Sequence, residues 1–475
     1  MKNSAVNPYL PLDEYVPDGE PRLFKDRLYI YGSHDTAGGN FFCLEDYVAW
    51  SAPQEDLSDW RYEGIIYRKK QDPSNPNGEL ELFAPDVVQG PDGRYYLYYC
   101  LRMVREFGVA VSDSPAGPFS FYGHVHYTDG TVLSEYMPYD PSVLVDDDGS
   151  VYLYYGFSSE MLAEKFNTEI SPGAMVVQLE KNMLTAKTKP QMCVPWHKLA
   201  VGTSFEGHAY FEAPSMRKIN NLYYLVYSSQ WCRELCYAVS RYPNKGFAYG
   251  GVIVDNADVG TEGRTVPAYI PGNNHGGLIQ VKNNTYIFYH RHTHGNSFSR
   301  QGCAEQVKIL PDGKILQVPI TSCGLNGGPL LAKGQFSAAI ACHLTGAKPE
   351  VLWDFRNVSL AQIPYIYEAA NQQGEKEQFI CNMTDGCVAG YRYFCAQEVN
   401  AIYVKLRGQA TGVLTVYTDA CKAQAAGSCT ITLHSQSWET YTLPCVLNDT
   451  YSLYFSFAGE GSFDFLNFTF TANEK

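Results

Sequence analysis

A short block of alternating large apolar residues recurs five times in the first two thirds of the chain. The blocks are YIYG at Tyr29, YLYY at Tyr96, YLYY at Tyr152, YLVY at Tyr224 and YIFY at Tyr286. They stand 56 to 72 residues apart, and turn signals such as PDG, DDDG and NN precede most of them. One unit of several short strands, repeated five times, predicts an all-β fold that begins with a five-bladed β-propeller. A long β-sandwich would also consist of strands, but it would not explain the regular period.

The pattern changes after the fifth repeat. A Gly-rich connection, GLNGGPLLAKGQ, follows it, and short alternating strands such as AIYVKLRG and YSLYFSFAG resume after Val351. Their number and alternation are typical of a β-sandwich. We therefore predict a propeller over residues 1–325, a linker over 326–350 and a C-terminal β-sandwich over 351–475.

The composition narrows the possible partners. The 475 residues exceed what one core usually supports, which agrees with two domains, and the 37 Tyr and 24 Phe favour strands and sugar-stacking surfaces. The formal net charge of −14 disfavours nucleic acid or an anionic membrane as a partner.

The 14 cysteines are scattered without a CxxC pair, and the N-terminus has no recognisable signal peptide. We therefore expect free thiols and a cytoplasmic location.

A distinctive polar residue stands 10 to 12 positions before each repeated tyrosine. In chain order these residues are Asp18, Asp86, Asp140, Glu212 and His275. The first strand of each propeller blade lines the central channel, so equivalent positions of five blades converge on the axis. We expect four carboxylates and one histidine at one mouth of the channel, where crowding raises some pKa values. The alternative is chance agreement among 50 acidic residues.

This carboxylate cluster predicts glycoside hydrolysis, because no phosphate-binding loop, Ser-His-Asp order or metal signature accompanies it. One acid would protonate the leaving oxygen and another would activate water or attack the sugar. A third would tune the acid. Glu212, in YFEAPSM, stands among aromatic and apolar residues, as a general acid of raised pKa requires; a solvated loop residue is the alternative.

Five stretches along the first domain together resemble glycoside hydrolase family 43, whose members are five-bladed propellers that cleave with inversion. The stretches are NPYLPLDEYVPDGEPRLF, FAPDVV, YDPSVLVDDDGSVYLYYG, FEAPSMRKINNLYYLVY and NNHGGLIQVKNNTYIFYHRH. The resemblance implies that Asp18 is the general base, that Asp140 modulates the pKa and orientation of the acid, and that Glu212 is the general acid. The family usually places the base in an Asp-Pro-Ser context, whereas here proline follows Glu20. Glu20 is therefore an alternative base, although the spacing to Tyr29 favours Asp18.

The same resemblance implies further site residues. His275 matches a channel histidine that in many members lies beside a hydrated calcium ion; a core histidine is the alternative. Arg300 matches an arginine that approaches the substrate, with a rim arginine as the alternative. Asp86 would contact the sugar, support the base or cap a turn. The candidates for stacking on a sugar face are Trp50, Phe83 and Trp231.

The C-terminal part, from IYEAANQQGEKEQFICNMTDG to FDFLNFTFT, resembles a family 6 carbohydrate-binding module. A ligand-stacking tryptophan is not evident there, since the only Trp after residue 360 is Trp438. A sandwich that braces the propeller without binding sugar is the alternative.

These inferences predict an exo-acting hydrolase that releases terminal α-L-arabinofuranose or β-D-xylose from arabinoxylan or xylo-oligosaccharides. Inversion would require the carboxyls of Asp18 and Glu212 to stand roughly 6.5–9.5 Å apart. The alternatives are a carbohydrate-binding propeller that has lost catalysis, an endo-arabinanase, and a retaining invertase-like propeller, whose WMNDPNG type of motif is missing.

Overall fold

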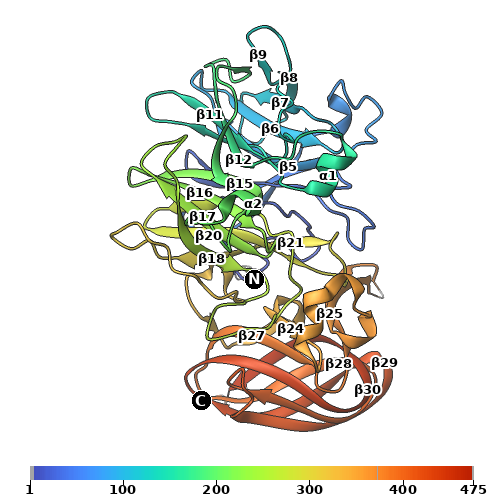
Figure 1. Cartoon of the computed structure of the whole chain (residues 1–475). Coiled ribbons are helices and arrows are strands. Elements are labelled where there is room, and N and C mark those ends of the chain that lie inside the picture. The colour runs from blue at the N-terminus through green and yellow to red at the C-terminus, as the bar shows by residue number, and fades with distance from the viewer. Residues whose placement is uncertain (1–4, 372, 473–475) are drawn as a thin grey trace.

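The computed structural model describes residues 5–371 and 373–472, which form two strand-built domains in succession (Figure 1). The first domain holds five mainly antiparallel sheets, one for each sequence repeat. The short helices lie in the connections between strands. They are η1 (Lys69–Gln71), α1 (Glu160–Lys165), α2 (His197–Ala200), η2 (Gly324–Asn326), η3 (Ala338–Ile340), η4 (Pro349–Asn357) and η5 (Leu360–Gln362).

Each sheet of the first domain is one propeller blade. Blade 1 comprises β1 (Glu20–Phe24), β2 (Arg27–Tyr31), β3 (Tyr47–Pro53) and β4 (Arg61–Tyr67). Blade 2 comprises β5 (Leu82–Gln89), β6 (Tyr95–Leu101), β7 (Phe107–Ser112) and β8 (Ser120–His124). Blade 3 comprises β10 (Ser142–Val145), β11 (Val151–Tyr155), β12 (Gly173–Leu179), β13 (Thr185–Ala186) and β14 (Gln191–Pro195), with β9 (His126–Tyr127) beside β13. Blade 4 comprises β15 (Tyr210–Ile219), β16 (Leu222–Ser229), β17 (Glu234–Ser240) and β18 (Ala248–Asp255). Blade 5 comprises β19 (Leu278–Val281), β20 (Asn284–His292) and β21 (Arg300–Val307).

The first strands of the blades form a closed ring around the channel. Contacts run from β1 to β5, β10, β15 and β19 and from β19 back to β1. The five repeated tyrosines all lie on the second strand of a blade. The N-terminal segment joins blade 5, where the Tyr9 amide donates to the carbonyl of Gly302 (3.2 Å) and the Ala304 amide donates to Asn7 Oδ1 (2.9 Å). The predicted five-bladed propeller is confirmed.

The second domain is also built of strands, in agreement with the all-β prediction. Its strands are β22 (Leu330–Leu331), β23 (Gly334–Ser337), β24 (His343–Thr345), β25 (Tyr365–Ala370), β26 (Lys376–Met383), β27 (Val388–Cys395), β28 (Val399–Tyr417), β29 (Ala425–Leu447) and β30 (Thr450–Ala472). All of them belong to one hydrogen-bonded sheet, whose long strands β28, β29 and β30 curve strongly (Figure 1). The segment predicted as a linker, 326–350, supplies β22, β23 and β24 to this sheet.

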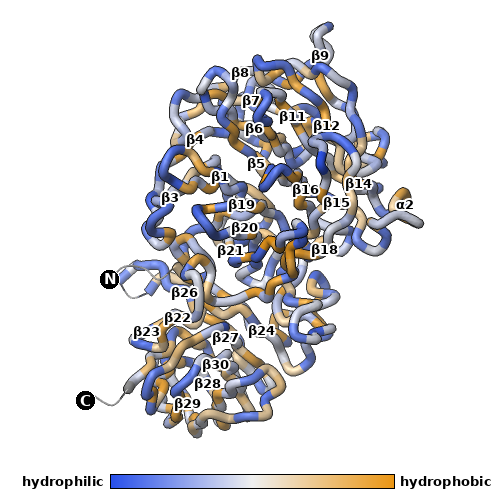
Figure 2. Tube along the Cα trace, turned by 90° about the vertical axis from the view of Figure 1, so that its left-hand side faces the viewer, coloured by the Kyte–Doolittle hydropathy of each residue, from blue (hydrophilic) through white to orange (hydrophobic). Residues whose placement is uncertain are grey.

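One hydrophobic core extends from blades 4 and 5 into the second domain. It includes Ile253 and Tyr289 of the propeller together with Ile380 and Phe394 of the second domain. Figure 2 shows hydrophobic residues along the strands of both domains and where the domains meet. The domains are therefore joined by packing as well as by the chain. In the described part of the sequence, no helix has the length and hydropathy needed to span a bilayer.

Candidate active site

The five polar residues predicted to line the channel all lie at the inner edge of their blades. Asp18, Asp140 and His275 come just before β1, β10 and β19, while Asp86 and Glu212 lie within β5 and β15. Asp18 and Asp140 share a left-handed backbone, with φ of 56° and 53°, a conformation that Asp tolerates better than most residues. The charges of Asp18 and Asp140 both act on Glu212. The predicted carboxylate cluster therefore exists at the channel.

Asp18 is bound by a buried arginine. Arg300 Nη1 donates to Asp18 Oδ1 at 2.8 Å, while Arg300 Nε and Nη2 bond the two oxygens of Asp35 at 2.8 and 3.0 Å. All three side chains are almost fully buried. Arg300 is thus a channel arginine rather than a rim arginine, and it holds the Asp18 carboxylate in place.

His290 of β20 supports Asp18, and His292 lies beside His290 on the same strand. Burial lowers the pKa of His290 well below its ordinary value and that of His292 to about 4, and the positive charge of Arg300 adds to both shifts. His290 Nε2 lies 2.9 Å from Asn273 Oδ1 and donates its proton to this oxygen. His292 lies between two oxygens, with Nε2 2.9 Å from Asn273 Oδ1 and Nδ1 3.3 Å from the Ile270 carbonyl. His290 Nδ1 is then free to accept the Asp18 backbone N–H, at 3.4 Å. This network orients Asp18 without adding charge.

Glu212 has the environment of a general acid. Burial raises the pKa of Glu212 well above its ordinary value, and the negative charges of Asp140 and Asp18 raise it further. Asp140 Oδ2 accepts the backbone N–H of Ala213, the next residue, at 3.2 Å. Burial also raises the pKa of Asp140, although the charge of His275 opposes that shift. Glu212 therefore keeps its proton at a pH where an exposed glutamate has lost it.

Glu20 and Asp86 lie in the same channel and, like Asp18, are paired with arginines. Glu20 Oε2 accepts Arg217 Nη2 at 2.6 Å and Ser215 Oγ at 3.1 Å. Asp86 Oδ1 accepts Arg22 Nε at 2.9 Å, and its Oδ2 accepts the Val143 backbone N–H at 2.7 Å. Both carboxylates are almost completely buried. Asp18 is also arginine-bound, so these contacts do not by themselves separate Asp18 from Glu20 as the base. They give Asp86 a bracing role between blades 1, 2 and 3 rather than a free face for a sugar.

The predicted stacking residues lie in different surroundings. Trp50 is buried in blade 1, where its indole N–H donates to Glu14 and its ring packs against Tyr62, so it presents no free ring face. A buried indole N–H needs a hydrogen-bond acceptor, and the sequence pattern gave no sign that Glu14 is the acceptor for Trp50. Trp231 is 52% exposed on the turn between β16 and β17.

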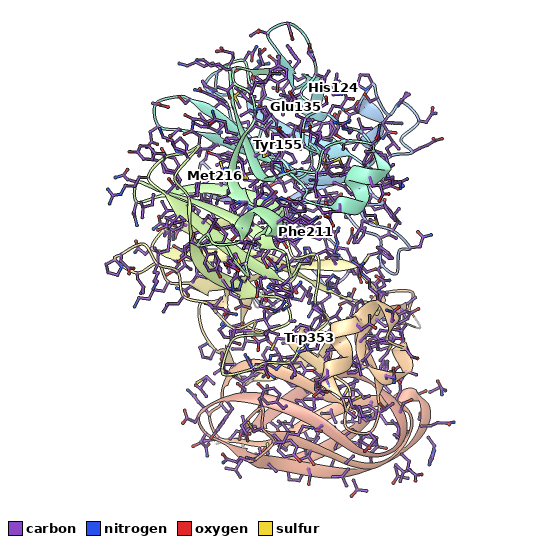
Figure 3. The ribbon with its side chains drawn as sticks, in the orientation of Figure 1. His124, Glu135, Tyr155, Phe211, Met216 and Trp353 are labelled. Atoms are coloured by element: carbon purple, nitrogen blue, oxygen red, sulfur yellow. The ribbon has the colours of Figure 1, made fainter. Side chains whose placement is uncertain are left out.

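Phe83 begins a row of rings that ends beside Glu212. The ring centroids lie 6.1 Å apart from Phe83 to Tyr139, 6.0 Å from Tyr139 to Phe157, and 5.1 Å from Phe157 to Phe211. Phe211, labelled in Figure 3, directly precedes Glu212. The row is an apolar stripe that connects Phe83 of blade 2 with Phe211 of blade 4.

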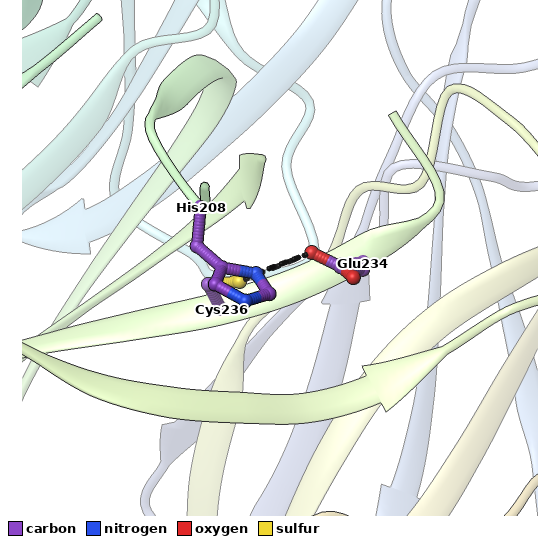
Figure 4. Close-up of side chains that lie close together, drawn as sticks. All are labelled: His208, Glu234 and Cys236. Carbon is purple, nitrogen blue, oxygen red and sulfur yellow. Dashed lines mark hydrogen bonds and ion pairs between the residues drawn. The ribbon is translucent and has the colours of Figure 1, made fainter. Parts of the chain in front are cut away.

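The described residues include one group of His, Cys, Asp and Glu side chains close enough to hold a metal directly, and His275 is not part of it. The group is His208, Glu234 and Cys236 of blade 4, whose ligand atoms lie within 4.8 Å of one another (Figure 4). Its atoms are already hydrogen-bonded: Glu234 Oε2 lies 2.9 Å from His208 Nδ1 and 2.8 Å from Ser229 Oγ. His275 Nδ1 instead lies 3.9 Å from Asp18 Oδ1.

The sequence reasoning missed several residues of the site. The alternation of His290 and His292 in YHRHTH places both on one face of a strand and could have indicated them. Asp35 and Asn273 lie in loops without any periodic pattern. Arg356 comes from η4, outside the repeats, yet its positive charge acts on Glu212.

Comparison with known proteins agrees with this geometry. The profile of the glycosyl hydrolases family 43 matches residues 16–315. A protein named xylosidase/arabinosidase from Thermoclostridium stercorarium is 45% identical over 99% of both chains. The structure of a family 43 arabinoxylan arabinofuranohydrolase from Bacillus subtilis aligns over 100% of this chain and 98% of its own, with a TM-score of 0.53 and 20% identity, a likeness of fold alone. A β-xylosidase/α-arabinofuranosidase from a compost microbial metagenome, solved with xylotriose in a calcium-free form, aligns over 64% of this chain and 94% of its own, with 26% identity and a TM-score of 0.51.

Proposed function

Because the chain belongs to glycosyl hydrolase family 43 and is a glycoside hydrolase, we propose that it releases terminal α-L-arabinofuranose or β-D-xylose from arabinoxylan oligosaccharides. The xylosidase/arabinosidase name of the 45% identical relative supports both sugars. The two sugars present similar atoms around the scissile bond, so one pocket can accept either. The observation that carries the proposal is that one channel holds both a buried Glu212, whose pKa is raised by burial and by Asp140 and Asp18, and the arginine-bound carboxylate of Asp18.

In the proposed mechanism, Glu212 donates its proton to the glycosidic oxygen as the bond to the anomeric carbon breaks. Asp18 accepts a proton from a water molecule, whose oxygen attacks the anomeric carbon from the opposite side. Inversion follows, and we predict a separation of roughly 6.5–9.5 Å between the two carboxyls. Asp140 fixes the backbone beside Glu212 and keeps the pKa of the acid high.

The first experiment compares hydrolysis of the 4-nitrophenyl glycosides of α-L-arabinofuranose and β-D-xylose. Release from either supports an exo-acting glycosidase, and the ratio identifies the preferred sugar. Proton NMR of the first product formed from an oligosaccharide should show the inverted anomer. The variant Glu212→Gln should lose turnover of the oligosaccharide but keep binding it. A folded wild-type protein that cleaves neither glycoside nor oligosaccharide would refute the proposal and favour a carbohydrate-binding propeller.

We also propose a hydrated calcium ion beside His275. Glu20 Oε1, buried and without a hydrogen-bond partner among the described residues, lies next to Gly277, two residues beyond His275. Among those residues His275 pairs with one carboxylate, that of Asp18. Ca²⁺ prefers six to eight oxygen ligands, so this donor set fits an ion held mainly by water. Such an ion would supply positive charge next to Asp18.

Removal of the ion tests this site. EDTA treatment, checked by elemental analysis, should lower both the melting temperature and kcat, and added Ca²⁺ should restore them. A protein that contains no calcium when isolated and is unchanged by EDTA would exclude it.

The cellular location is a separate proposal, a reducing compartment such as the cytoplasm. It is supported by the 14 cysteines, all of them free in the structure. Titration of the freshly isolated, denatured protein with a thiol reagent should find all 14 reduced.

A further inference from the structure

Two exposed tryptophans from different domains flank a single arginine. Trp231 is 52% exposed and Trp353 is 46% exposed, and they are the exposed members among the six tryptophans of the chain. The guanidinium carbon of Arg233 lies 5.7 Å from the centre of the Trp231 ring and 5.1 Å from that of the Trp353 ring. Arg233 is itself partly buried and paired with Asp255, with 2.9 Å between Nε and Oδ2. The arginine therefore holds the two rings near each other as a fixed pair.

The turn that carries Trp231 is attached to the channel. The backbone N–H of Asn274 donates to the carbonyl of Cys232, and its side-chain Nδ2 donates to the carbonyl of Arg233, both at 2.8 Å. Asn274 directly precedes His275. Burial raises the pKa of the Cys232 thiol to about 12, and the negative charge of Glu212 contributes to that shift. The turn that carries Trp231 is thus hydrogen-bonded to the residue that precedes His275 of the channel.

The segment that carries Trp353 also reaches the site. Leu352 is fully buried in the core shared by the two domains and anchors η4 (Pro349–Asn357). Phe355 lies over His292, with 6.5 Å between the ring centroids. The charge of Arg356 acts on Glu212. Figure 3 shows Trp353 where the propeller meets the second domain.

We propose that Trp231 and Trp353 form the binding platform for the sugar units on the leaving-group side of the cleaved bond, so that η4 completes the active site. The inference rests on the proposed function. Asp18 and Arg300 are buried, so they mark the inner end of the site, where the terminal sugar is held. The leaving group then points outward, toward the half-exposed rings. The apolar faces of xylosyl units stack on such rings, and the guanidinium of Arg356 can donate hydrogen bonds to their hydroxyls.

The occupant is a short neutral oligosaccharide rather than a protein or an anion. The exposed surface is limited to two rings with a partly buried arginine between them, and Glu234 balances the charge of Arg233, with 3.4 Å between Nη2 and Oε1. Such a narrow polar-edged platform suits a sugar ring, which offers one apolar face and peripheral hydroxyls.

The test compares substrates with and without leaving-group sugars. For Trp353→Ala, kcat/KM on a xylo- or arabinoxylo-oligosaccharide should fall roughly tenfold, mainly through KM, while kcat/KM on the glycosyl fluoride of the same terminal sugar should stay unchanged. Trp353→Phe should keep most of the oligosaccharide activity. Tyr242→Ala is the matched control, because Tyr242 is 55% exposed and stands beside Lys245 on a remote turn of blade 4. Melting temperatures confirm that each variant is folded.

The outcomes separate the two proposals. Equal losses on both substrates, or no loss on either, would overturn the platform while leaving the hydrolase intact. If the wild-type protein cleaves neither substrate, the proposed function fails. Calorimetric titration with xylotetraose then tests sugar binding by the platform without catalysis. The platform is supported if Trp353→Ala binds xylotetraose roughly tenfold more weakly than wild type, and it is excluded if the two proteins bind equally.

Discussion

Replacing Arg300 with methionine should both destabilise the protein and stop catalysis. The guanidinium neutralises Asp18 and Asp35 in a buried setting, with nitrogen–oxygen distances of 2.8 Å to each carboxylate. At an effective dielectric constant of about 20, each pair contributes a gross attraction of roughly 6 kcal/mol. Desolvation offsets much of this attraction in the intact pair. Removing one partner leaves the carboxylates buried and uncompensated, so we expect the free energy of unfolding to fall by about 3–5 kcal/mol.

The pH dependence of this loss follows from Asp35. Burial already raises the pKa of Asp35, and the charge of Arg300 opposes that shift. Without Arg300 the pKa of Asp35 in the folded protein rises further above its unfolded value of about 3.9. The extra destabilisation caused by Arg300→Met is therefore greatest when the pH lies above the pKa of Asp35 in the folded protein. It disappears as the pH falls toward the pKa of Asp35 in the unfolded protein. The stability difference between variant and wild type should shrink between pH 7 and pH 4.

Urea unfolding followed by tryptophan fluorescence measures this difference, and Arg94→Met is the control. Arg94 and Asp92 form a comparable pair at 2.8 Å, but both are about 40% exposed, so its removal should cost no more than about 1 kcal/mol. The double variant Arg300→Met with Asp35→Asn should recover part of the lost stability. A loss for Arg300→Met as small as that for Arg94→Met, at every pH, would refute the assigned burial and pairing.

Three further predictions concern the catalytic carboxylates. Glu212→Gln should lower kcat on oligosaccharides by roughly 10²–10⁴-fold and raise the free energy of unfolding, more at pH 7 than at pH 4, because folding raises the pKa of Glu212 and penalises its ionised form. The hydrolysis rate should fall as the pH rises through the pKa of Glu212. Because the charge of Arg356 lowers that pKa, Arg356→Met should move this alkaline fall in rate to higher pH. An alkaline fall that stays at the same pH would contradict Glu212 as the acid. Asp18→Asn should abolish turnover, whereas Glu20→Gln should mainly lower the melting temperature by leaving Arg217 unpaired; the reverse result would make Glu20 the base.

The sequence predicted those parts of the site that repeat with the blades. The five tyrosines fixed the phase of the strands, and residues 10 to 12 positions before them, such as Glu212 and His275, do lie at the channel. Spacing cannot tell which channel carboxylates are paired with arginines, because the partners of Asp86 and Glu20, Arg22 and Arg217, come from other blades. Asp18 and Glu20 both accept an arginine from another blade, so the Asp18→Asn and Glu20→Gln variants decide which of them is the base.

The aromatic residues show a second limit. Trp50 and Trp231 look alike in sequence, but one packs on Tyr62 inside a blade and the other is half exposed on a turn. Burial of a side chain depends on its neighbours in space, which the local pattern does not reveal. Trp353 lies in a segment outside the repeats, so the period gave no reason to place it at the site.

The pairing of the N-terminal segment with blade 5 has a consequence for biosynthesis. Asn7 bonds Glu305 Oε1 and the carbonyls of Ala304 and Thr321, about 300 residues further along the chain. A contact this distant in sequence forms slowly, because a long loop must close before the contact can stabilise it. On the ribosome, blades 1 to 4 can be complete while the ring is still open. The channel and its carboxylates would then take their final positions only after blade 5 has emerged, so catalytic competence should appear late in folding, after most of the strands have formed.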